Sequence, residues 1–193
     1  MKAFGKAYKD VEAASGGDFK KLPAGGYICE IKAVEDVPAK EYLRVVYDVA
    51  TGEFKGYYAD EWGQEHPFAH CMYWSYKDTN KKYFKANMAA VDKANMTDFN
   101  TALEGSKDFN EQQLVGKKIG LIIGYEEYKT DRGEIRERTY VVAVRSTDGL
   151  QEWLGKVAKG EAKLPELKKL KEEAAPASPY PEFVGVKDSD IPF

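Results

Sequence analysis

Cationic and aromatic side chains interleave in two short stretches of the sequence. The first is YKDTNKKYFK, residues 76–85, and the second is YKTDRGEIRERTY, residues 128–140. Cations can follow phosphates and flat rings can stack on unpaired bases, so this combination is typical of surfaces that bind single-stranded nucleic acid. A charged face exposed to solvent is the alternative explanation for either stretch taken alone.

The segment EYLRVVYDV adds a ring and a cation to this set. Strict alternation places Leu43, Val45 and Tyr47 on one face of a strand and Tyr42 with Arg44 on the other. If the first face fills a core, the second points outward. The nucleic-acid-binding residues that we expect are Tyr42, Arg44, Lys55, Tyr57, Trp62, Trp74, Tyr76, Lys81, Lys82, Lys129, Arg132, Arg136 and Arg138. Each Tyr or Trp of this set has a core position as its alternative, because aromatic residues also dominate cores.

Catalytic chemistry has less support in the sequence. The best candidates for the acidic site of a metal-dependent nuclease are Asp60, Glu61 and Glu65 beside His66. Acids without a fixed spacing, however, usually belong to a solvated loop. The segment HPFAHC lacks a fourth metal ligand, and we expect it to be loop packing. No P-loop, HExxH motif or Ser-His-Asp order is present. We therefore expect no enzyme, no cofactor and no metal site.

Length and composition indicate one globular domain with additional segments. The chain has 193 residues, of which 13% are aromatic, and its formal net charge is -3, so any basic surface must be local. Cys29 and Cys71 form no disulfide framework, and free thiols are expected. No apolar run has the length of a membrane span or of a secretory signal, so we expect a cytoplasmic location.

The pattern of apolar residues predicts strands interrupted by a helix. One strand begins near Tyr27, with Tyr27, Cys29, Ile31 and Ala33 on one face; a second follows in EYLRVVYDV, and Thr51-Gly52 turns the chain into a third strand in FKGYYADEW. Helical spacing then predicts a helix between about Lys81 and Glu104. Two more strands follow in GKKIGLIIGYEEY and EIRERTYVVAVRS, joined by a hairpin turn in KTDRG.

This order of elements predicts a mainly β fold with helices. Three strands, a helix and two further strands are the order of the oligonucleotide-binding (OB) fold, a five-stranded Greek-key barrel with a helix between strands 3 and 4. In such barrels the second and third strands and two flanking loops form the binding surface. An α+β sandwich is the alternative that the same order allows.

Three regions of the chain differ in composition. We expect residues 1–148 to form the OB-fold domain and residues 149–173 to form a helical extension of two short helices, the second carrying Leu164, Leu167 and Leu170. Residues 174–193 contain several prolines and no periodicity, and are expected to be a flexible tail.

The chain ends in KDSDIPF, which leaves two apolar residues at an acidic terminus. The last six residues closely resemble the acidic tip of bacterial and bacteriophage single-stranded DNA-binding proteins, usually Asp-Asp-Asp-Ile-Pro-Phe, and only Ser189 departs from that form. The segments LPAGGYICEIKAVED and QQLVGKKIGLIIGYEEYKTDRGE also resemble bacteriophage proteins of this type. The resemblance implies a partner-docking tip composed of Asp188, Asp190, Ile191, Pro192 and Phe193.

The resemblance also implies what the chain does. Such a protein binds single-stranded DNA without sequence preference, protects it during replication, recombination and repair, and recruits partner enzymes through its tip. A strand-annealing recombination protein, and an adaptor without a DNA site of its own, remain as alternatives. We expect single-stranded DNA and replication, recombination or repair proteins as partners and no membrane, and a homodimer or higher homo-oligomer is left open.

Overall fold

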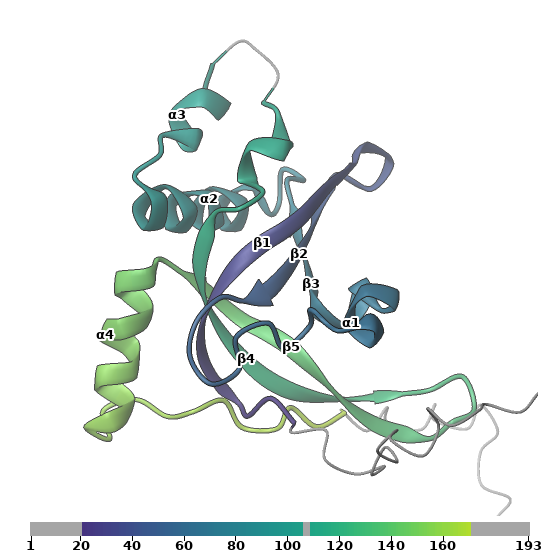
Figure 1. The fold of residues 1–193 in the computed structure, drawn as a ribbon. Coiled ribbons are helices and arrows are strands. Elements are labelled where there is room, and N and C mark those ends of the chain that lie inside the picture. Colours follow the sequence, from purple (N-terminus) through teal and green to yellow (C-terminus); the bar gives the residue numbers. More distant parts are fainter. Residues whose placement is uncertain (1–20, 106–108, 171–193) are drawn as a thin grey trace, which may run out of the picture.

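A five-stranded antiparallel sheet forms the body of the molecule (Figure 1). The computed structural model of the chain describes residues 21–105 and 109–170, except for the side chains of residues 61 and 62. The strands are β1 (Gly25–Val37), β2 (Tyr42–Val49), β3 (Cys71–Ser75), β4 (Lys118–Lys129) and β5 (Ile135–Arg145). Their order in the sheet is β3-β2-β1-β4-β5, so β3 and β5 are the two edges and the sheet is not closed.

Helices cover the sheet at several places. The α-helices are α1 (Glu61–Glu65), α2 (Lys81–Asn95), α3 (Phe99–Leu103) and α4 (Thr147–Ala158), and the 3-10 turns are η2 (Pro38–Lys40), η3 (Pro67–His70) and η4 (Glu111–Leu114). The longest helix, α2, packs against β3, β4 and β5 and buries Met88 and Val91 in the core. In Figure 1, α4 and α1 lie on opposite sides of the sheet. No helix of the described residues is long and apolar enough to cross a membrane.

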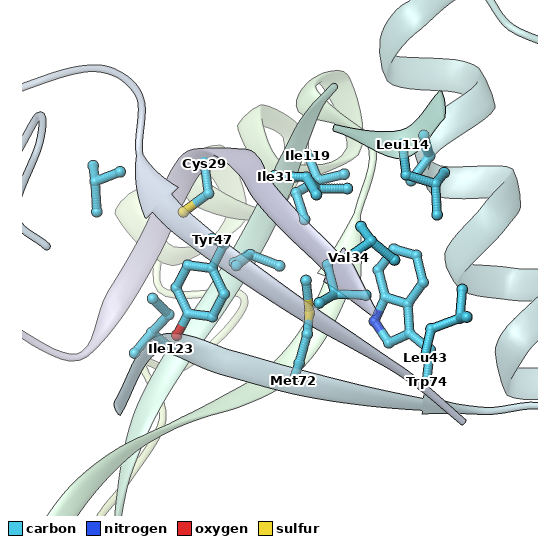
Figure 2. Packing of buried hydrophobic residues seen from close by; sticks show 14 of the residues in the cluster. Cys29, Ile31, Val34, Leu43, Tyr47, Met72, Trp74, Leu114, Ile119 and Ile123 are labelled. Carbon is cyan, nitrogen blue, oxygen red and sulfur yellow. The ribbon is translucent and has the colours of Figure 1, made fainter. Parts of the chain in front are cut away.

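Alternation along β2 and β3 separates a core face from an outer face. Leu43, Val45, Tyr47 and Val49 of β2 are buried, whereas Tyr42 and Arg44 lie on the opposite face, as predicted. The inward residues of β3 are Met72 and Trp74. Figure 2 shows these side chains packed with residues of β1 and β4, including Ile31 and Ile123.

The face predicted for β1 is correct from Tyr27, which packs against the core, to Ile31, and is wrong at Ala33. Cys29 and Ile31 are buried, but the register shifts between Ile31 and Ala33, and Val34 rather than Ala33 points into the core. A β-bulge inserts one extra residue, which moves every later side chain to the other face. Ala33 is therefore exposed.

The third strand lies elsewhere than predicted. Residues 51–58 form turns, because Gly52 and Gly56 adopt positive φ angles of 84° and 72°, which a strand does not use. The buried carboxylate of Asp48 holds these turns by accepting hydrogen bonds from the backbone N–H groups of Val49 and Tyr58. The third strand is instead Cys71–Ser75, directly after the turn η3 in HPFAHC.

The predicted helix after β3 is present but divided. The chain leaves α2 at Met96, which has a φ of 54°, and starts α3 at Phe99. Asp92 joins the two helices, because its carboxylate accepts hydrogen bonds from the backbone N–H groups of Phe99 and Asn100. The last hairpin is confirmed: β4 and β5 pair along their length, and Gly133 has a φ of 82° in the turn between them.

Only one of the two predicted C-terminal helices forms. The helix α4 begins at Ser146, whose hydroxyl accepts a hydrogen bond from Gly149 N. The second helix is absent from residues 161–170, where Pro165 interrupts the apolar spacing. This segment runs beside β4 instead: Lys168 N donates to Tyr125 O, and Glu127 N donates to Lys168 O, both at 2.9 Å. Residues 171–193 lie outside the described residues.

Close packing of α4 on the sheet depends on Gly120 of β4. A Cβ atom at this position would lie 2.7 Å from Leu150 Cβ and 3.0 Å from Ser146 O. Gly120→Ala should therefore lower the free energy of unfolding by roughly 1–3 kcal/mol, as overpacking usually does. Denaturant unfolding of the intact chain measures this change.

Gly155 is the matched control within α4, because a Cβ there meets no atom within 4 Å. Gly155→Ala should be neutral or stabilising by up to about 1 kcal/mol, since alanine is the better helix former. Equal effects of the two substitutions would contradict the packing argument.

His70 should make folding stability depend on pH. It is buried against the ring of Tyr58, with ring centroids 4.5 Å apart, and burial lowers the pKa of His70 more than the carboxylates of Asp48 and Asp60 raise it. Below the usual histidine pKa of about 6.5 the unfolded chain takes up a proton that the folded chain resists. The free energy of unfolding should therefore fall as pH decreases from 7.5 to 5.5.

Unfolding of His70→Phe over the same pH range isolates this contribution. His70→Phe should show a shallower fall than wild type. The same pH dependence in wild type and His70→Phe would refute the assignment.

Candidate nucleic-acid interface

One row of side chains crosses three strands on the outer face of the sheet. Glu35 of β1 is paired with Arg44 of β2, and Arg44 is paired with Tyr73 of β3 in the strand register. Residues directly opposite each other on antiparallel strands project to the same face, so these three side chains are neighbours. The Arg44 guanidinium forms an ion pair with Glu35.

Exposed aromatic rings surround this row. Phe68 of η3 and Tyr73 are 66% and 52% exposed, and the ring of Tyr42 meets that of Tyr73 edge to face with centroids 5.1 Å apart. Arg44 Cζ lies 5.0 Å from the centroid of the Phe68 ring. Because these rings are exposed and lie close to a cation, they can stack with a flat ligand.

A cavity of about 480 Å³ separates the two edges of the sheet. Phe68 and Tyr73 line it from η3 and β3, and Arg138 and Tyr140 line it from β5. The Thr139 hydroxyl donates a hydrogen bond to Ala69 O at 3.4 Å and so joins the two sides. We call this cavity, with the residues that line it, the edge groove.

The hairpin of β4 and β5 extends the edge groove along a long arm. Only Lys118–Ile123 of β4 pair with β1, while β4 and β5 remain paired out to Lys129 and Ile135, and Figure 1 shows this arm projecting from the body. Arg138 Cζ lies 5.2 Å from the centroid of the Tyr128 ring. The arm thus carries cations beside rings, like the β2–β3 face.

Carboxylates neutralise several of these cations. Glu126 accepts ion pairs from Arg138 at 2.8 Å and from Lys168 at 3.0 Å, and Glu134 pairs with Arg136 at 2.7 Å. Burial by itself raises the pKa of Glu126, but the hydrogen bonds from Lys168 and Arg138 outweigh this effect and hold the pKa below its usual value. Glu126 therefore remains charged at neutral pH.

The expected binding residues fall into separate groups. Tyr42 and Arg44 lie on the β2–β3 face, and Arg136 and Arg138 lie on the hairpin arm. Lys129 and Arg132 are exposed near the end of that arm. The expected residues at the start of the sheet (42 and 44) and on the last hairpin (129–138) thus lie in one region of the surface. Trp62 lies in α1, and its side chain is outside the described residues.

Other members of the expected set lie away from the edge groove. Tyr57 packs on Tyr58, and its hydroxyl accepts a hydrogen bond from Leu22 N, while Lys55 is exposed in the same turns. Tyr76 donates to Asp36 and, with Lys81, lines a different cavity of about 420 Å³. Lys82 lies 4.9 Å from the centroid of Tyr83 on α2.

Trp74 is a core residue rather than a stacking platform. Its side chain is 2% exposed, and Figure 2 shows the indole beside Leu43. The reason is its position in β3: Trp74 alternates with Tyr73, so when one ring faces outward the other must face inward. Trp74 thus contributes only to the wall of the edge groove, and Tyr73 is the exposed ring of β3.

Several residues of the edge groove and of the hairpin arm beside it were absent from the expected set. Phe68 and Tyr73 were missed because β3 was placed in the wrong segment; alternation in CMYWS would have identified Tyr73 as outward-facing. Tyr128 and Tyr140 bound the interleaved stretch of residues 128–140, which was a usable signal. Lys168 had no local signal, because it reaches Glu126 only through the tertiary fold.

The described residues contain no candidate metal-binding site. Over these residues, no group of three or more His, Cys, Asp or Glu side chains could hold a metal ion. Asp60 instead accepts a hydrogen bond from Gly63 N at 2.8 Å in α1, and Glu65 and His66 are exposed. The side chain of Glu61 and the expected docking residues 188–193 are outside the described residues.

Comparison with known proteins adds no relative to this description. No protein-family model matches the chain, and no curated protein matches it. The function of the edge groove must therefore follow from its own side chains and from the chemistry that they can perform.

Proposed function

We propose that this chain is a single-stranded DNA-binding protein that acts without sequence preference and recruits partner enzymes through its C-terminal tip. The observation that carries the proposal is the edge groove. The exposed rings of Phe68 and Tyr73 lie across it from Arg138 and the ring of Tyr140 of β5. Nonspecific single-strand binding needs this combination of stacking platforms and phosphate-binding cations.

The strand order supports an OB-type barrel as the finer description of the fold. The order β3-β2-β1-β4-β5 leaves β3 and β5 as the only unjoined neighbours of a five-membered ring. Approach of these two edges across the edge groove would give the Greek-key barrel. In that fold, the second and third strands and the loop between the fourth and fifth form the usual oligonucleotide surface, where Tyr42, Arg44 and Arg132 lie.

The chemistry of the interface favours single strands over duplexes. Phe68 and Tyr73 offer ring faces, which can stack only on bases that are not already stacked in a duplex. Every base has a π-face, so stacking carries little sequence preference. Because the net charge is -3, the phosphate-binding cations would act locally, as Arg44 beside Phe68 and Arg138 beside Tyr128 are placed to do.

The proposed setting follows from the resemblance of the C-terminal tip. We propose that the protein is bacteriophage-encoded, acts in the bacterial cytoplasm, and serves replication, recombination or repair. The terminal Phe193 would enter an apolar pocket of the partner enzyme, and the acids would pair with a basic rim. A role as an adaptor without a DNA site, or as an annealing protein, is tested by the experiments that follow.

Removing the exposed rings should weaken DNA binding. Phe68→Ala and Tyr73→Ala should each weaken the binding of oligo(dT) by about 1–3 kcal/mol, because each substitution removes a ring on which one base stacks. Titration of each variant with oligo(dT) at one salt concentration measures this loss. Thermal unfolding shows whether each variant is still folded. Tyr83→Ala is the control, because it removes an exposed ring of α2 that does not line the edge groove.

Two outcomes would contradict the proposal. If wild-type protein does not bind oligo(dT) in a salt-dependent manner, the chain is an adaptor without a DNA site. If it binds but Phe68→Ala and Tyr73→Ala behave like Tyr83→Ala, the DNA site lies outside the edge groove. Rapid pairing of complementary strands in the same assay would instead identify an annealing protein.

Removal of the C-terminal tip should separate partner binding from DNA binding. Deletion of residues 188–193 should leave oligo(dT) affinity equal or slightly higher, because acids that compete with phosphates are lost. Capture of partner enzymes from a bacterial lysate should collapse. Phe193→Ala alone should cause most of this loss, since a pocket-filling ring is the expected hot spot.

Ser189→Ala is the matched control for the tip, because Ser189 is the residue that departs from the usual acidic form. It should retain partner capture. Recovery of the same partners by wild type, the deletion and Phe193→Ala would refute the docking role.

A further inference from the structure

Three rings of the interface share a second feature: a cation that is itself held by a carboxylate lies close to Phe68, to Tyr128 and to Tyr140. Arg44 is paired with Glu35 and lies 5.0 Å from the Phe68 centroid. Distances below about 6 Å are those of favourable cation–π contacts. The ring, the cation and the carboxylate form one unit.

The same unit recurs around Glu126 on the hairpin arm. Arg138 is 2.8 Å from the Glu126 carboxylate and 5.2 Å from the Tyr128 centroid. Lys168 is 3.0 Å from the other oxygen of Glu126, and its Nζ lies 5.2 Å from the Tyr140 centroid. Sheet strands that are far apart in the sequence thus present the same arrangement.

This arrangement has a consequence for binding. A base needs a face of the ring, and a phosphate needs the cation, but in the unbound protein the cation lies near the ring and is paired with the carboxylate. A strand that uses the ring face beside the cation must therefore exchange partners: the phosphate takes the cation from the carboxylate, and that ring face becomes available to the base. Exposed ion pairs are weak enough to exchange, and the side chains of Arg44 and Glu35 are 29% and 54% exposed.

We propose that Glu35 and Glu126 are internal counterions that set the affinity and the salt dependence of the interface and couple phosphate capture to ring exposure. This inference rests on the proposed function. A phosphate contact to single-stranded DNA normally releases salt ions and contributes about 0.7 to the slope of log affinity against log salt. A carboxylate that loses its cation takes up a salt cation in exchange, so the net release is smaller.

Glu35→Gln tests the internal counterion while keeping the shape of the side chain. It should tighten oligo(dT) binding about two- to fivefold at low salt, the range expected for an exposed ion pair. The salt slope should become steeper by up to about 0.7, because Arg44 then behaves as an ordinary phosphate ligand. Titrations between low and high salt give both quantities.

Glu104→Gln is the matched control. It makes the same change in net charge and frees Lys85, whose Nζ is 2.8 Å from Glu104 beside the other cavity. It should leave the affinity within experimental error and the slope unchanged. If Glu104→Gln and Glu35→Gln act alike, net charge explains the effect and the internal counterion is refuted.

Arg44→Ala tests the coupling to the ring. It removes a phosphate ligand but leaves the Phe68 face bare. Its oligo(dT) affinity should be lower than wild type at low salt and equal or higher at high salt, where phosphate contacts are screened and stacking dominates. An affinity reduced by the same factor at every salt concentration would show that Arg44 does not restrict access to Phe68.

The outcomes separate this inference from the proposed function. Absence of wild-type binding to oligo(dT) would overturn both. Salt-dependent wild-type binding with an unchanged affinity and slope in Glu35→Gln would overturn the inference alone. Matching thermal unfolding midpoints for all variants establish that the differences arise at the interface.

Discussion

The central strand β1 is shared between two partners, and the arrangement of the whole sheet depends on this sharing. It pairs with β4 through Gly25–Glu30 and with β2 through Cys29–Val37, so the two pairings overlap only at Cys29 and Glu30. The bulge after Ile31 bends the strand where it passes from one partner to the other. The sheet therefore curves, and its two edges come to lie on either side of one groove. Without this bend, the rings of η3 and β3 would not face the cations of β5.

Local patterns were sufficient for part of this fold. Alternation in residues 42–49 identified the outward position of Tyr42 and Arg44, because side-chain direction in a strand depends only on the period of two. The last hairpin was also predictable, because its turn in KTDRG needs a residue with a positive φ and Gly133 supplies it. The helix α4 was expected from residue 149 onward because Leu150, Trp153, Leu154 and Val157 have helical spacing; its start at the Ser146 cap was not predicted. In each case the residues that give the sequence pattern are the same residues that form the element.

The remaining features depend on contacts between distant residues. FKGYYADEW has the aromatic composition of a strand, but Asp48 and the left-handed Gly52 and Gly56 hold it in turns. That error displaced β3, and with it the choice between Tyr73 and Trp74 as the outward ring. The extended segment around Lys168 was equally hidden, because it pairs with backbone groups of β4 that β1 leaves unpaired. The candidate site was thus predictable on β2 and on the hairpin, but not where it crosses β3.

The backbone pairing of Lys168 with β4 also fixes where the chain leaves the body. Leu170, the last residue described, donates its backbone N–H to the Glu127 carboxylate at 3.0 Å, on the arm that borders the edge groove. A binding partner held by a short tether is confined to a small volume around the anchoring point, which can correspond to millimolar local concentration. Under the docking role that we propose for residues 188–193, a captured enzyme would be linked through Leu170 to the arm beside the edge groove, and its encounter with a ligand in the groove would depend less on free diffusion.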